Sequence, residues 1–444
     1  MKINATHPEY DKAAPLWKKC RDCIEGEEAV KAAKSLYLKP LPGDPGRYAA
    51  YLDRAMFFNA VGRTSAALQG FLFRKPAQMS PDRDSVGGFS SQGTTSDFVR
   101  KITMELISVG RAGVLVDAPV DGGDPVLSLY FTEDIINWRT DSDGNPVLVV
   151  LRECRLTPKP NDVFVVEERV FYRVLRLENG GYVQELYLHD KDEFILQSVT
   201  APVRNGSNLD HIPFVCINAV GGVGFHVVKP PLLDLVNVNL SHYKSSADLE
   251  NGRHFVGFPT PWAAGFDLSE GESLEIGAVA WVTDNENAKA GFLEFTGQGL
   301  GALENALSEK EKMMAVLGAR LLEGQKKAAE AADTYRLRYA GEQSVLSEIA
   351  RSGDEGVSRA FQICAEWRLR PDWESYGLEL NRDYAATVAD PQLVATMFAA
   401  LQGGGVSYNT WFENLKAWEL VPESRTLDDE LALIEARRGD EFGA

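Results

Sequence analysis

The stretch that decides the fold has two parts, which read PPLLDLVNVNLSHYKSSADLENG at residues 230–252 and LGALENALSEKEKMMAVLGARLL at residues 300–322. Both parts place apolar residues every three or four positions, which is the spacing of one face of a helix. In the first part these residues are Leu232, Val236, Leu240, Tyr243 and Ala247; in the second they are Leu303, Leu307, Met314, Leu317 and Leu321. Each part is therefore predicted to be an amphipathic helix.

The two predicted helices bracket a segment of different character. The first helix runs from Pro231 to about Glu250, with Gly252 placed to end it, since glycine readily adopts the left-handed conformation found after helices. The second runs from about Leu300 to Leu321. Short strands are predicted between them, at Phe255–Pro261, Ser273–Thr283 and Ala288–Phe295. A helix, a small β module and a returning helix make a protruding hairpin rather than a pocket, which suits a part of an assembly better than an enzyme.

Length and charge narrow the function classes. With 444 residues the chain can form two or three domains, or one elongated subunit of several parts. Its net charge of −18 argues against a whole surface that binds nucleic acid or an anionic membrane. The N-terminal residues show no signal-peptide pattern. The longest uncharged apolar stretch, residues 212–228, is short for a membrane span and contains Pro213, so it is predicted to be a buried strand and turn.

The N-terminal half predicts helices followed by an antiparallel sheet, an α+β arrangement. Residues 8–75 and the segment after a Gly- and Ser-rich loop at residues 80–96 have helical spacing. The apolar positions are Leu16, Cys20, Cys23 and Ile24 in one helix, Tyr51, Ala55, Phe58 and Gly62 in the next, and Phe98, Ile102, Leu106 and Val109 after the loop. The predicted strands are Val114–Val116, Val126–Phe131, Ile135–Arg139, Val147–Leu151, Val170–Leu177 and Tyr182–Leu188.

A long helix is predicted from Asp333 to Arg370. It contains Gly341, Gly353 and Gly356, each of which costs about 1 kcal/mol against alanine, so a bend or a close packing contact is expected there.

The C-terminal part is predicted to be a short strand and three short helices. Ser407 is placed as the N-cap of the second helix, and Thr426 with Asp429 forms a capping box for the third. The strand is Leu378–Leu380, and the helices are Pro391–Leu401, Tyr408–Trp418 and Leu427–Arg438.

Two motifs resemble metal sites but have simpler explanations. Cys20 and Cys23 have redox or metal spacing, but they lack a second pair and share a helix face, so core packing is favoured. The five cysteines are scattered and odd in number, which does not indicate disulfides. The run from Asp141 to Asn145 resembles a calcium loop, but its sixth position is Pro146 rather than glycine, so a hairpin turn is predicted.

Neither a metal nor a cofactor is predicted. The six histidines are far apart, and none has a second ligand at the spacing that metal sites use. The glycines at Gly297, Gly299 and Gly301 could hold an anion at a helix start, although a hinge is favoured.

Residues 391–418 have the pattern of a helix-turn-helix, the DNA-binding motif. From Asp390 to the C-terminus, however, 10 residues are acidic and 4 are basic, and a recognition helix needs cations for phosphate contacts. Simple helix packing is therefore favoured.

Several stretches carry a resemblance to a known family: PPLLDLVNVNLSHY at Pro230–Tyr243, LEFTGQGLGAL at Leu293–Leu303, VSYNTW at Val406–Trp411, and HPEY at His7–Tyr10 with Trp17 and the Cys20–Asp22 run after it. With these stretches and a similar order of parts over nearly its whole length, the chain resembles the portal proteins of tailed bacteriophages. It most resembles a prophage-encoded subgroup catalogued only as a domain of unknown function.

The resemblance implies a division of the chain into the parts of the portal fold. These parts are a wing at residues 1–229, stem helices at 230–253 and 298–320, a clip at 254–297, a tunnel loop at 321–332, a long wing helix and strand at 333–388, and a helical crown at 389–444. The tunnel loop would place Glu323, Gln325, Lys326 and Lys327 along a channel, where the two lysines would touch the DNA backbone transiently. The alternative for these four residues is a solvated linker.

The resemblance also implies a role without chemistry of its own. Portal subunits form a homo-oligomeric ring, usually of twelve, at one vertex of the capsid, where double-stranded DNA passes without sequence specificity during packaging and ejection. Terminase (through its large subunit) and head–tail adaptors would dock on the ring, and capsid and scaffold proteins would surround it, with no cofactor and no membrane. The expected location is the virion, and the bacterial host cytoplasm during assembly.

Two other functions stay open from the residues alone. The chain could be another virion structural protein, such as an adaptor or a capsid protein. It could also be a hydrolase that uses paired carboxylates, since 64 acidic residues permit such a pair, although no spacing singles one out.

Overall fold

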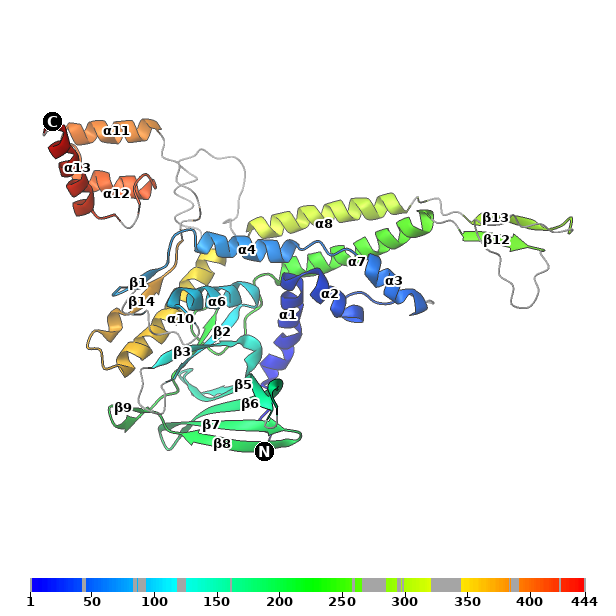
Figure 1. The fold of residues 1–444 in the computed structure, drawn as a ribbon, viewed down its shortest axis with the longest axis horizontal. Helices are drawn as coiled ribbons and strands as arrows, with labels where there is room; N and C mark the ends of the chain where they lie inside the picture. The colour runs from blue at the N-terminus through cyan, green and yellow to red at the C-terminus, as the bar shows by residue number, and fades with distance from the viewer. Residues whose placement is uncertain are drawn as a thin grey trace. The chain divides into compact units, whose positions relative to one another are not determined.

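The computed structural model divides the chain into two units, Met1–Arg382 and Asp383–Ala444, which are described separately (Figure 1). The structure describes residues 2–41, 45–82, 86, 93–117, 125–159, 162–257, 260–265, 285–293, 297, 299–320, 345–382, 384, 391–422 and 425–442. Within these ranges none of the helices combines the length and the apolar character needed to cross a lipid bilayer. The fold is mixed, with helices and antiparallel sheets, as predicted.

Unit 1 begins with helices, as the spacing in residues 8–75 predicts. They are α1 Pro8–Glu25, α2 Glu27–Ala32, the 3₁₀ turns η1 Lys34–Leu36 and η2 Pro45–Arg47, α3 Tyr48–Arg54 and α4 Ala60–Leu72, followed beyond the loop by α6 Thr95–Ser108. The apolar positions predicted for α6, among them Phe98 and Leu106, are buried. Thr94 caps α6 by accepting a hydrogen bond from the backbone N–H of Asp97.

The single helix predicted through Tyr51, Ala55, Phe58 and Gly62 is wrong, because the chain forms two helices there. The backbone is extended at Ala55, with φ −61° and ψ 134°, which ends α3. The side chain of Asn59 then accepts a hydrogen bond from the backbone N–H of Gly62 at 2.7 Å and starts α4. The cap at Asn59 therefore starts a new helix, although the apolar spacing continues from α3 into α4.

A five-stranded antiparallel sheet forms the lower part of unit 1 in Figure 1. Its strands are consecutive in sequence and in space: β4 Ile135–Thr140, β5 Pro146–Lys159, β6 Asp162–Glu178, β7 Gly181–Asp190 and β8 Glu193–Thr200. The hairpin turn predicted at Asp141 is confirmed, because its Oδ1 accepts hydrogen bonds from the backbone N–H groups of Asp143 and Asn145. Strands β5 and β6 are longer than predicted, and β8 was not predicted.

A smaller three-stranded sheet has the order β11-β2-β3 and lies under α6 and α10. Its strands are β2 Arg111–Asp117, β3 Val126–Phe131 and β11 Phe214–Asn218, and the short η3 Thr132–Asp134 leads from β3 into β4. Strand β11 is buried throughout and lies in the apolar stretch predicted to be a buried strand and turn. Between β8 and β11 the chain forms a small pair, β9 Val203–Arg204 and β10 Ser207–Asn208.

Helix α10, Val345–Trp367, closes over the smaller sheet, and Gly356 permits the close approach to β11. A Cβ at Gly356 would lie 2.5 Å from Cγ1 of Ile217 on β11, and one at Gly353 would lie 3.4 Å from a methyl of Leu380. The packing reason is confirmed for Gly356, whereas a Cβ at Gly353 would make only an ordinary van der Waals contact. Gly341 and the rest of the predicted helix before residue 345 lie outside the described residues.

The strand predicted at Leu378–Leu380 is present as β14 Gly377–Glu379, which follows η4 Trp373–Ser375 and pairs with β1 Gln78–Ser80. Asp354 on α10 holds the following residues in place: its carboxylate accepts hydrogen bonds from the backbone N–H of Leu380 and from the Arg382 guanidinium. Burial raises the pKa of Asp354 to about 6, although Arg382 acts in the opposite direction.

Unit 2 contains three helices, α11 Pro391–Gln402, α12 Tyr408–Ala417 and α13 Leu427–Phe442, close to the predicted ranges. Both predicted caps are confirmed. Ser407 accepts a hydrogen bond from the backbone N–H of Thr410, and Thr426 and Asp429 bond each other's backbone N–H groups. Trp411, Phe412 and Trp418 are the buried large apolar residues among those that the structure describes in unit 2.

Candidate functional site

The two predicted bracketing helices are present as α7 Leu233–Gly257 and α8 Leu300–Arg320. They pack side by side, and Figure 1 shows them running together away from the sheets of unit 1. Lys310 on α8 donates to the backbone carbonyl of Ser241 on α7 at 3.2 Å, and Arg253 on α7 pairs with Glu304 on α8 at 2.9 Å. Contacts along both helices therefore hold them as an antiparallel pair.

Gly252 lies inside α7, so the prediction that it ends the helix is wrong. A Cβ at Gly252 would lie 2.7 Å from a methyl of Leu300, the first residue of α8. The glycine leaves room for the Leu300 side chain and does not adopt a left-handed turn. As a result α7 continues to Gly257, and the strand predicted from Phe255 starts only at Thr260.

A buried amide fixes the base of α7 to the N-terminal helices. The side chain of Asn239, which is fully buried, donates to the backbone carbonyl of Phe58 at 2.8 Å and accepts from the backbone N–H of Val61 at 3.3 Å. Further along α7, the Tyr51 hydroxyl donates to Asp248 at 2.6 Å. Both ends of this amide are satisfied, which makes it a specific anchor for α7.

A β-hairpin continues from the paired ends of α7 and α8. It consists of β12 Thr260–Ala264 and β13 Lys289–Leu293, which pair antiparallel in agreement with the strand predicted at Ala288–Phe295 (Figure 1). Trp262 lies over Gly291 on the opposite strand, where a Cβ would come within 3.2 Å of the indole. Trp262 and Phe292 both remain substantially exposed. The predicted strand Ser273–Thr283 lies outside the described residues.

Helix α8 is covered unevenly. One side contacts α7, and Met314 is buried on the side that faces α4, where a groove of about 480 Å³ lies between α4 and α8. On its outer side Met313 is 52% exposed and Val316 is 49% exposed. We call these two residues the outer apolar pair of α8. Large apolar side chains that are neighbours on an exposed helix face are typical of a contact surface.

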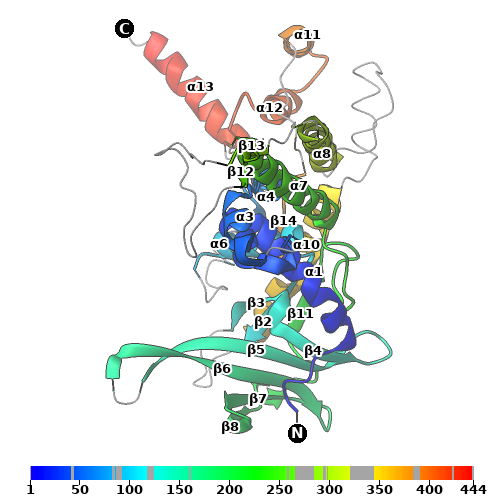
Figure 2. The ribbon, with the colours of Figure 1, turned by 90° about the vertical axis from the view of Figure 1, so that its right-hand side faces the viewer.

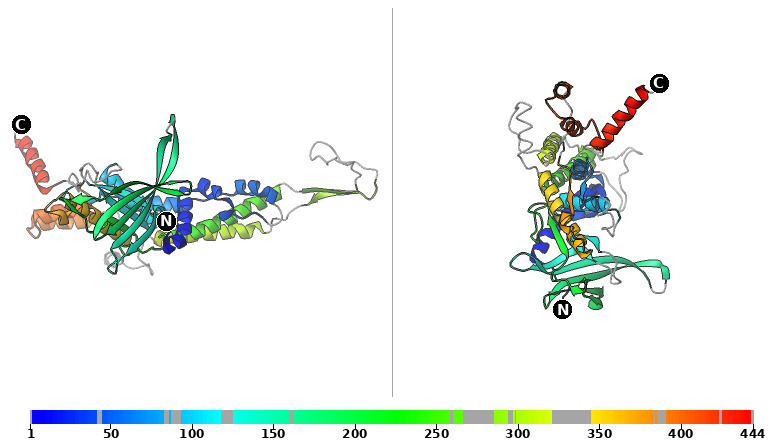
Figure 3. Two further views of the ribbon diagram at one scale, coloured as in Figure 1. Left: turned by 90° about the horizontal axis from the view of Figure 1, so that it is seen from below. Right: turned by 90° about the vertical axis from the view of Figure 1, so that its left-hand side faces the viewer.

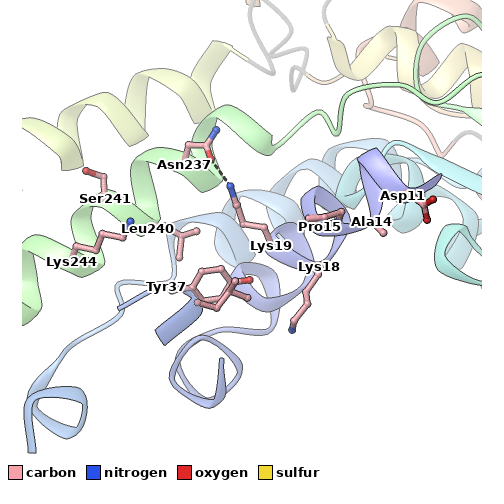
Figure 4. Close-up of a pocket in the computed structure, with 11 residues that line it drawn as sticks. Asp11, Ala14, Pro15, Lys18, Lys19, Tyr37, Asn237, Leu240, Ser241 and Lys244 are labelled. Atoms are coloured by element: carbon pink, nitrogen blue, oxygen red, sulfur yellow. Dashed lines mark hydrogen bonds between the residues drawn. The ribbon is translucent and has the colours of Figure 1, made fainter. Parts of the chain in front are cut away.

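A pocket of about 740 Å³ lies where α1 meets α7 (Figure 4). Its lining combines apolar residues, among them Pro15, Tyr37 and Leu240, with three lysines. Lys18 pairs with Asp22, and Lys19 donates to the side chain of Asn237 at 3.4 Å, as the dashed line in Figure 4 marks. Both lysines therefore interact with other side chains of the same chain. We interpret the pocket as a gap at the junction of two helices rather than as a binding site.

Several buried or half-buried acidic groups of unit 1 lie in ion pairs with arginines. Arg21 binds both oxygens of Glu105, at 2.7 and 2.6 Å, and both oxygens of Glu133, each at 2.8 Å. Burial raises the pKa of Glu105, against the effect of Arg21. Burial would also raise the pKa of Glu153, but its hydrogen bonds with Arg173 bring that pKa below its usual value. These pairs tie α1, α6 and the sheets together, which is a structural role.

The cysteine pair at Cys20 and Cys23 is buried, as core packing predicts. Burial raises the pKa of each thiol to about 12, so neither is a thiolate at neutral pH. Among the residues that the structure describes, no group of three or more His, Cys, Asp or Glu side chains could hold a metal ion. Gly297 begins the turn into α8, since its carbonyl accepts the backbone N–H of Leu300 at 2.9 Å.

The four channel candidates, Glu323, Gln325, Lys326 and Lys327, lie outside the described residues and stay a prediction. The helix-turn-helix candidate corresponds to α11 and α12. Helix α11 carries no charged residue, and α12 carries only Glu413 and Lys416. Such helices have too few cations to bind DNA phosphates.

Residues 231–368 match the model of a family described as a domain of unknown function, DUF4055. The resemblance to a subgroup catalogued in that way is confirmed over this segment, which contains α7, α8 and α10. No curated protein matches the chain.

Among solved structures, the chain is similar to one described as the virion of a native gene transfer agent particle, with 13% identity, a TM-score of 0.40, and coverage of 86% of this chain and 96% of that one. It is also similar to one from the neck of the empty particle computed with C6 symmetry, with 12% identity, a TM-score of 0.40, and coverage of 90% and 100%. A third is from the neck of the native particle computed with C12 symmetry, with 9% identity, a TM-score of 0.37, and coverage of 86% and 95%.

Proposed function

We propose that this chain is the subunit of a portal ring, the channel at one capsid vertex through which double-stranded DNA is packaged and ejected. The observation that carries the proposal is the antiparallel pair α7–α8, which is anchored at its base by Asn239 and joined at its other end to the β12–β13 hairpin. The portal resemblance implies this arrangement for a stem and a clip. The family match, which begins at residue 231, spans the same helices.

The outer apolar pair of α8 supports assembly through this helix. Met313 and Val316 are about half exposed in the single chain, so burying the remaining half of each side chain would contribute roughly 1 kcal/mol. A head-to-tail ring brings the same face of every subunit against its neighbour, so one pair of residues is used once per subunit. In the proposed ring, this pair lies against the stem of the adjacent copy.

The negative charge of the chain is consistent with a channel that does not bind DNA tightly. A subunit of net charge −18, repeated around an axis, repels the phosphates of a duplex that passes along that axis. Cations would then be needed only at isolated places, which is the role we assign to Lys326 and Lys327 in the tunnel loop.

We further propose that terminase and head–tail adaptors dock on the β12–β13 hairpin. Trp262 and Phe292 offer exposed aromatic surface on the part of the hairpin that the structure describes. Aromatic residues are enriched among those that contribute most to protein interfaces.

The alternative of a carboxylate hydrolase has less support. Such an enzyme needs an acid and a base that face a substrate. Two buried carboxylates of unit 1 instead form ion pairs with arginines, Glu105 with Arg21 and Asp354 with Arg382.

The native particle of the purified chain tests the proposal. Negative-stain class averages are expected to show rings with a central hole, and mass photometry a mass of about 0.6 MDa for twelve copies of 48.9 kDa. Thirteen copies would also support a portal ring. A closed shell or an extended sheet would indicate a capsid protein instead, and a monomer or dimer at micromolar concentration would contradict the proposal.

A further inference from the structure

The five-stranded sheet continues on one side as a two-stranded ribbon. Strand β4 pairs with β5 only as far as Leu151, and β7 pairs with β6 only from Val170 onward, whereas β5 and β6 stay paired to Lys159. The ribbon therefore consists of residues 152–159 and 162–169, and Figures 2 and 3 show it extending beyond the other strands. A two-stranded hairpin is marginally stable on its own in water, so a ribbon of this kind is expected to be covered.

The two faces of the ribbon differ sharply. On one face the charges neutralise each other within the ribbon, since Arg155 pairs with Glu153 and Arg169 pairs with Glu167. The opposite face is mostly apolar: Leu156 is 73% exposed, and Phe164 is 93% exposed. We call this opposite face the apolar ribbon face; its residues are Cys154, Leu156, Pro158, Phe164 and Val166, together with one charged residue, Glu168, which lies opposite Leu156.

The same side of the sheet is also apolar at its far edge, strand β8. Alternation along the strands and the register of pairing place Leu196 and Val199 on the side of Leu156, and both are about half exposed. Between the ribbon and β8, Ile3 and Tyr10 of the N-terminal segment cover this side of the sheet. The covered middle leaves two separate apolar surfaces, one on the ribbon and one on β8.

We infer that the apolar ribbon face of one copy lies on the β8 edge of the next copy. The inference rests on the ring proposed above and names a contact between its neighbours. Because the two surfaces lie at opposite ends of one sheet and differ from each other, the contact is head-to-tail, which repeats around a ring instead of stopping at a dimer. An edge strand such as β8 also has unpaired backbone groups that a further strand can bind.

The small local charge of the ribbon and of β8 favours these surfaces as the contact between two copies of the chain. Two chains of net charge −18 repel each other, so a contact between them is favoured where the local charge is small. The ribbon segment 152–169 contains four basic and four acidic residues, and β8 contains one acidic residue and no basic one. Both surfaces are therefore nearly neutral within a strongly acidic chain.

The small area of the apolar ribbon face favours another copy of this chain, rather than a separate protein, as the molecule that covers it. A free ribbon of eight residues is about 26 Å long and about 10 Å wide, so one face offers roughly 250 Å². A stable complex of two independent proteins buries about 800 Å² on each partner. The ribbon is thus too small to hold a separate partner by itself, but it is sufficient for neighbours that are also held together through α8.

Cross-linking through Cys154 tests the inference in the full-length protein. Cys154 lies on the apolar ribbon face and is exposed, whereas Cys20, Cys23, Cys216 and Cys364 are buried. The Val199→Cys variant, treated with a short bismaleimide, is expected to give a denaturation-resistant ladder from dimer upward. Each link in this ladder would join Cys154 of one copy to the introduced thiol on β8 of the next copy.

The matched control is Ser198→Cys, since Ser198 is exposed but points to the opposite face of β8. The control is expected to give at least five-fold less product.

The outcomes separate this inference from the proposed function. Rings in class averages together with a ladder from Val199→Cys alone support both. Rings without that ladder, or an equal ladder from Ser198→Cys, overturn the ribbon contact and leave the ring in place. Cross-linked dimers of the unmodified protein through two copies of Cys154 would show a two-fold contact and overturn the inference. If no ring forms, the proposed function and the ribbon contact fail together.

Discussion

Helices α10 and α8 have similar lengths, 23 and 21 residues, but they differ in how much of each helix is buried. More than half of the residues of α10 are buried, and the helix approaches β11 so closely that Gly356 has no room for a side chain. In α8, Met314 alone is buried among the residues whose side chains the structure describes. Helix α10 thus belongs to the framework of unit 1, whereas α8 keeps exposed apolar surface, which we propose to be a contact with another copy of the chain.

Removing an apolar side chain from each helix should give the largest contrast in stability. Phe361 on α10 is fully buried, so Phe361→Ala is expected to lower the free energy of unfolding by about 3–5 kcal/mol. Met313 on α8 is half exposed, and Met313→Ala should change it by less than about 0.5 kcal/mol in the dissociated subunit. Urea unfolding measures both values, and similar losses would remove the distinction between the helices.

The buried carboxylate of α10 should make stability depend on pH. Because burial raises the pKa of Asp354 to about 6, from an unperturbed 3.8, the folded state binds this proton more tightly than the unfolded state. The free energy of unfolding should therefore fall by up to about 3 kcal/mol as the pH rises from about 3 to about 7, most of it between pH 4 and pH 6.

The Asp354→Asn variant should show a flatter curve of unfolding free energy over the same pH range. Asp234→Asn, at an exposed position on α7, serves as the control and should keep the slope of the unmodified protein. An unchanged slope in Asp354→Asn would show that another group causes the dependence.

Two glycine substitutions should act in opposite directions. In Gly356→Ala the new methyl would meet Ile217 at 2.5 Å, and overpacking of this kind costs about 1–3 kcal/mol. In Gly301→Ala on α8 the new methyl meets nothing within 4 Å, so the higher helix propensity of alanine should add up to about 1 kcal/mol. Thermal unfolding in parallel compares the two, and a stabilised Gly356→Ala would contradict the close packing of α10.

The smallest change in subunit stability should accompany the largest change in assembly. Replacing the outer apolar pair of α8 in Met313→Glu/Val316→Glu puts charges on a face already exposed to water, so the melting temperature of the subunit should be nearly unchanged. The same charges would be buried between copies in the proposed ring, which is costly without partners. Sedimentation velocity should therefore show dissociation, whereas intact rings would place the interface elsewhere.

The sequence predicts the helices well where apolar spacing and a local cap agree. Ser407 and Thr426 mark the starts of α12 and α13 because each side chain satisfies a backbone N–H of its own helix. The errors arise where a contact distant in sequence decides the local structure. Gly252 does not end α7, because Leu300 of α8 packs against it across the helix pair.

The candidate site is only partly readable from the sequence. The α7–α8 pair and its hairpin follow from periodicity, but the anchoring amide of Asn239 gives no signal, because its partners on Phe58 and Val61 are backbone groups. The ribbon was missed although apolar residues alternate at Leu156 and Pro158. Alternation shows that one face is apolar, but only the pairing of neighbouring strands shows that this face is uncovered.

The count of subunits in the native particle tests the central claim most directly, because it asks whether the exposed face of α8 joins copies of this chain. Native mass spectrometry of the unmodified protein is predicted to give a closed oligomer of about twelve copies, each of 48.9 kDa. The Met313→Glu/Val316→Glu variant is predicted to give folded monomers under the same conditions. Monomers from both proteins, or the same ring from both, would contradict the account.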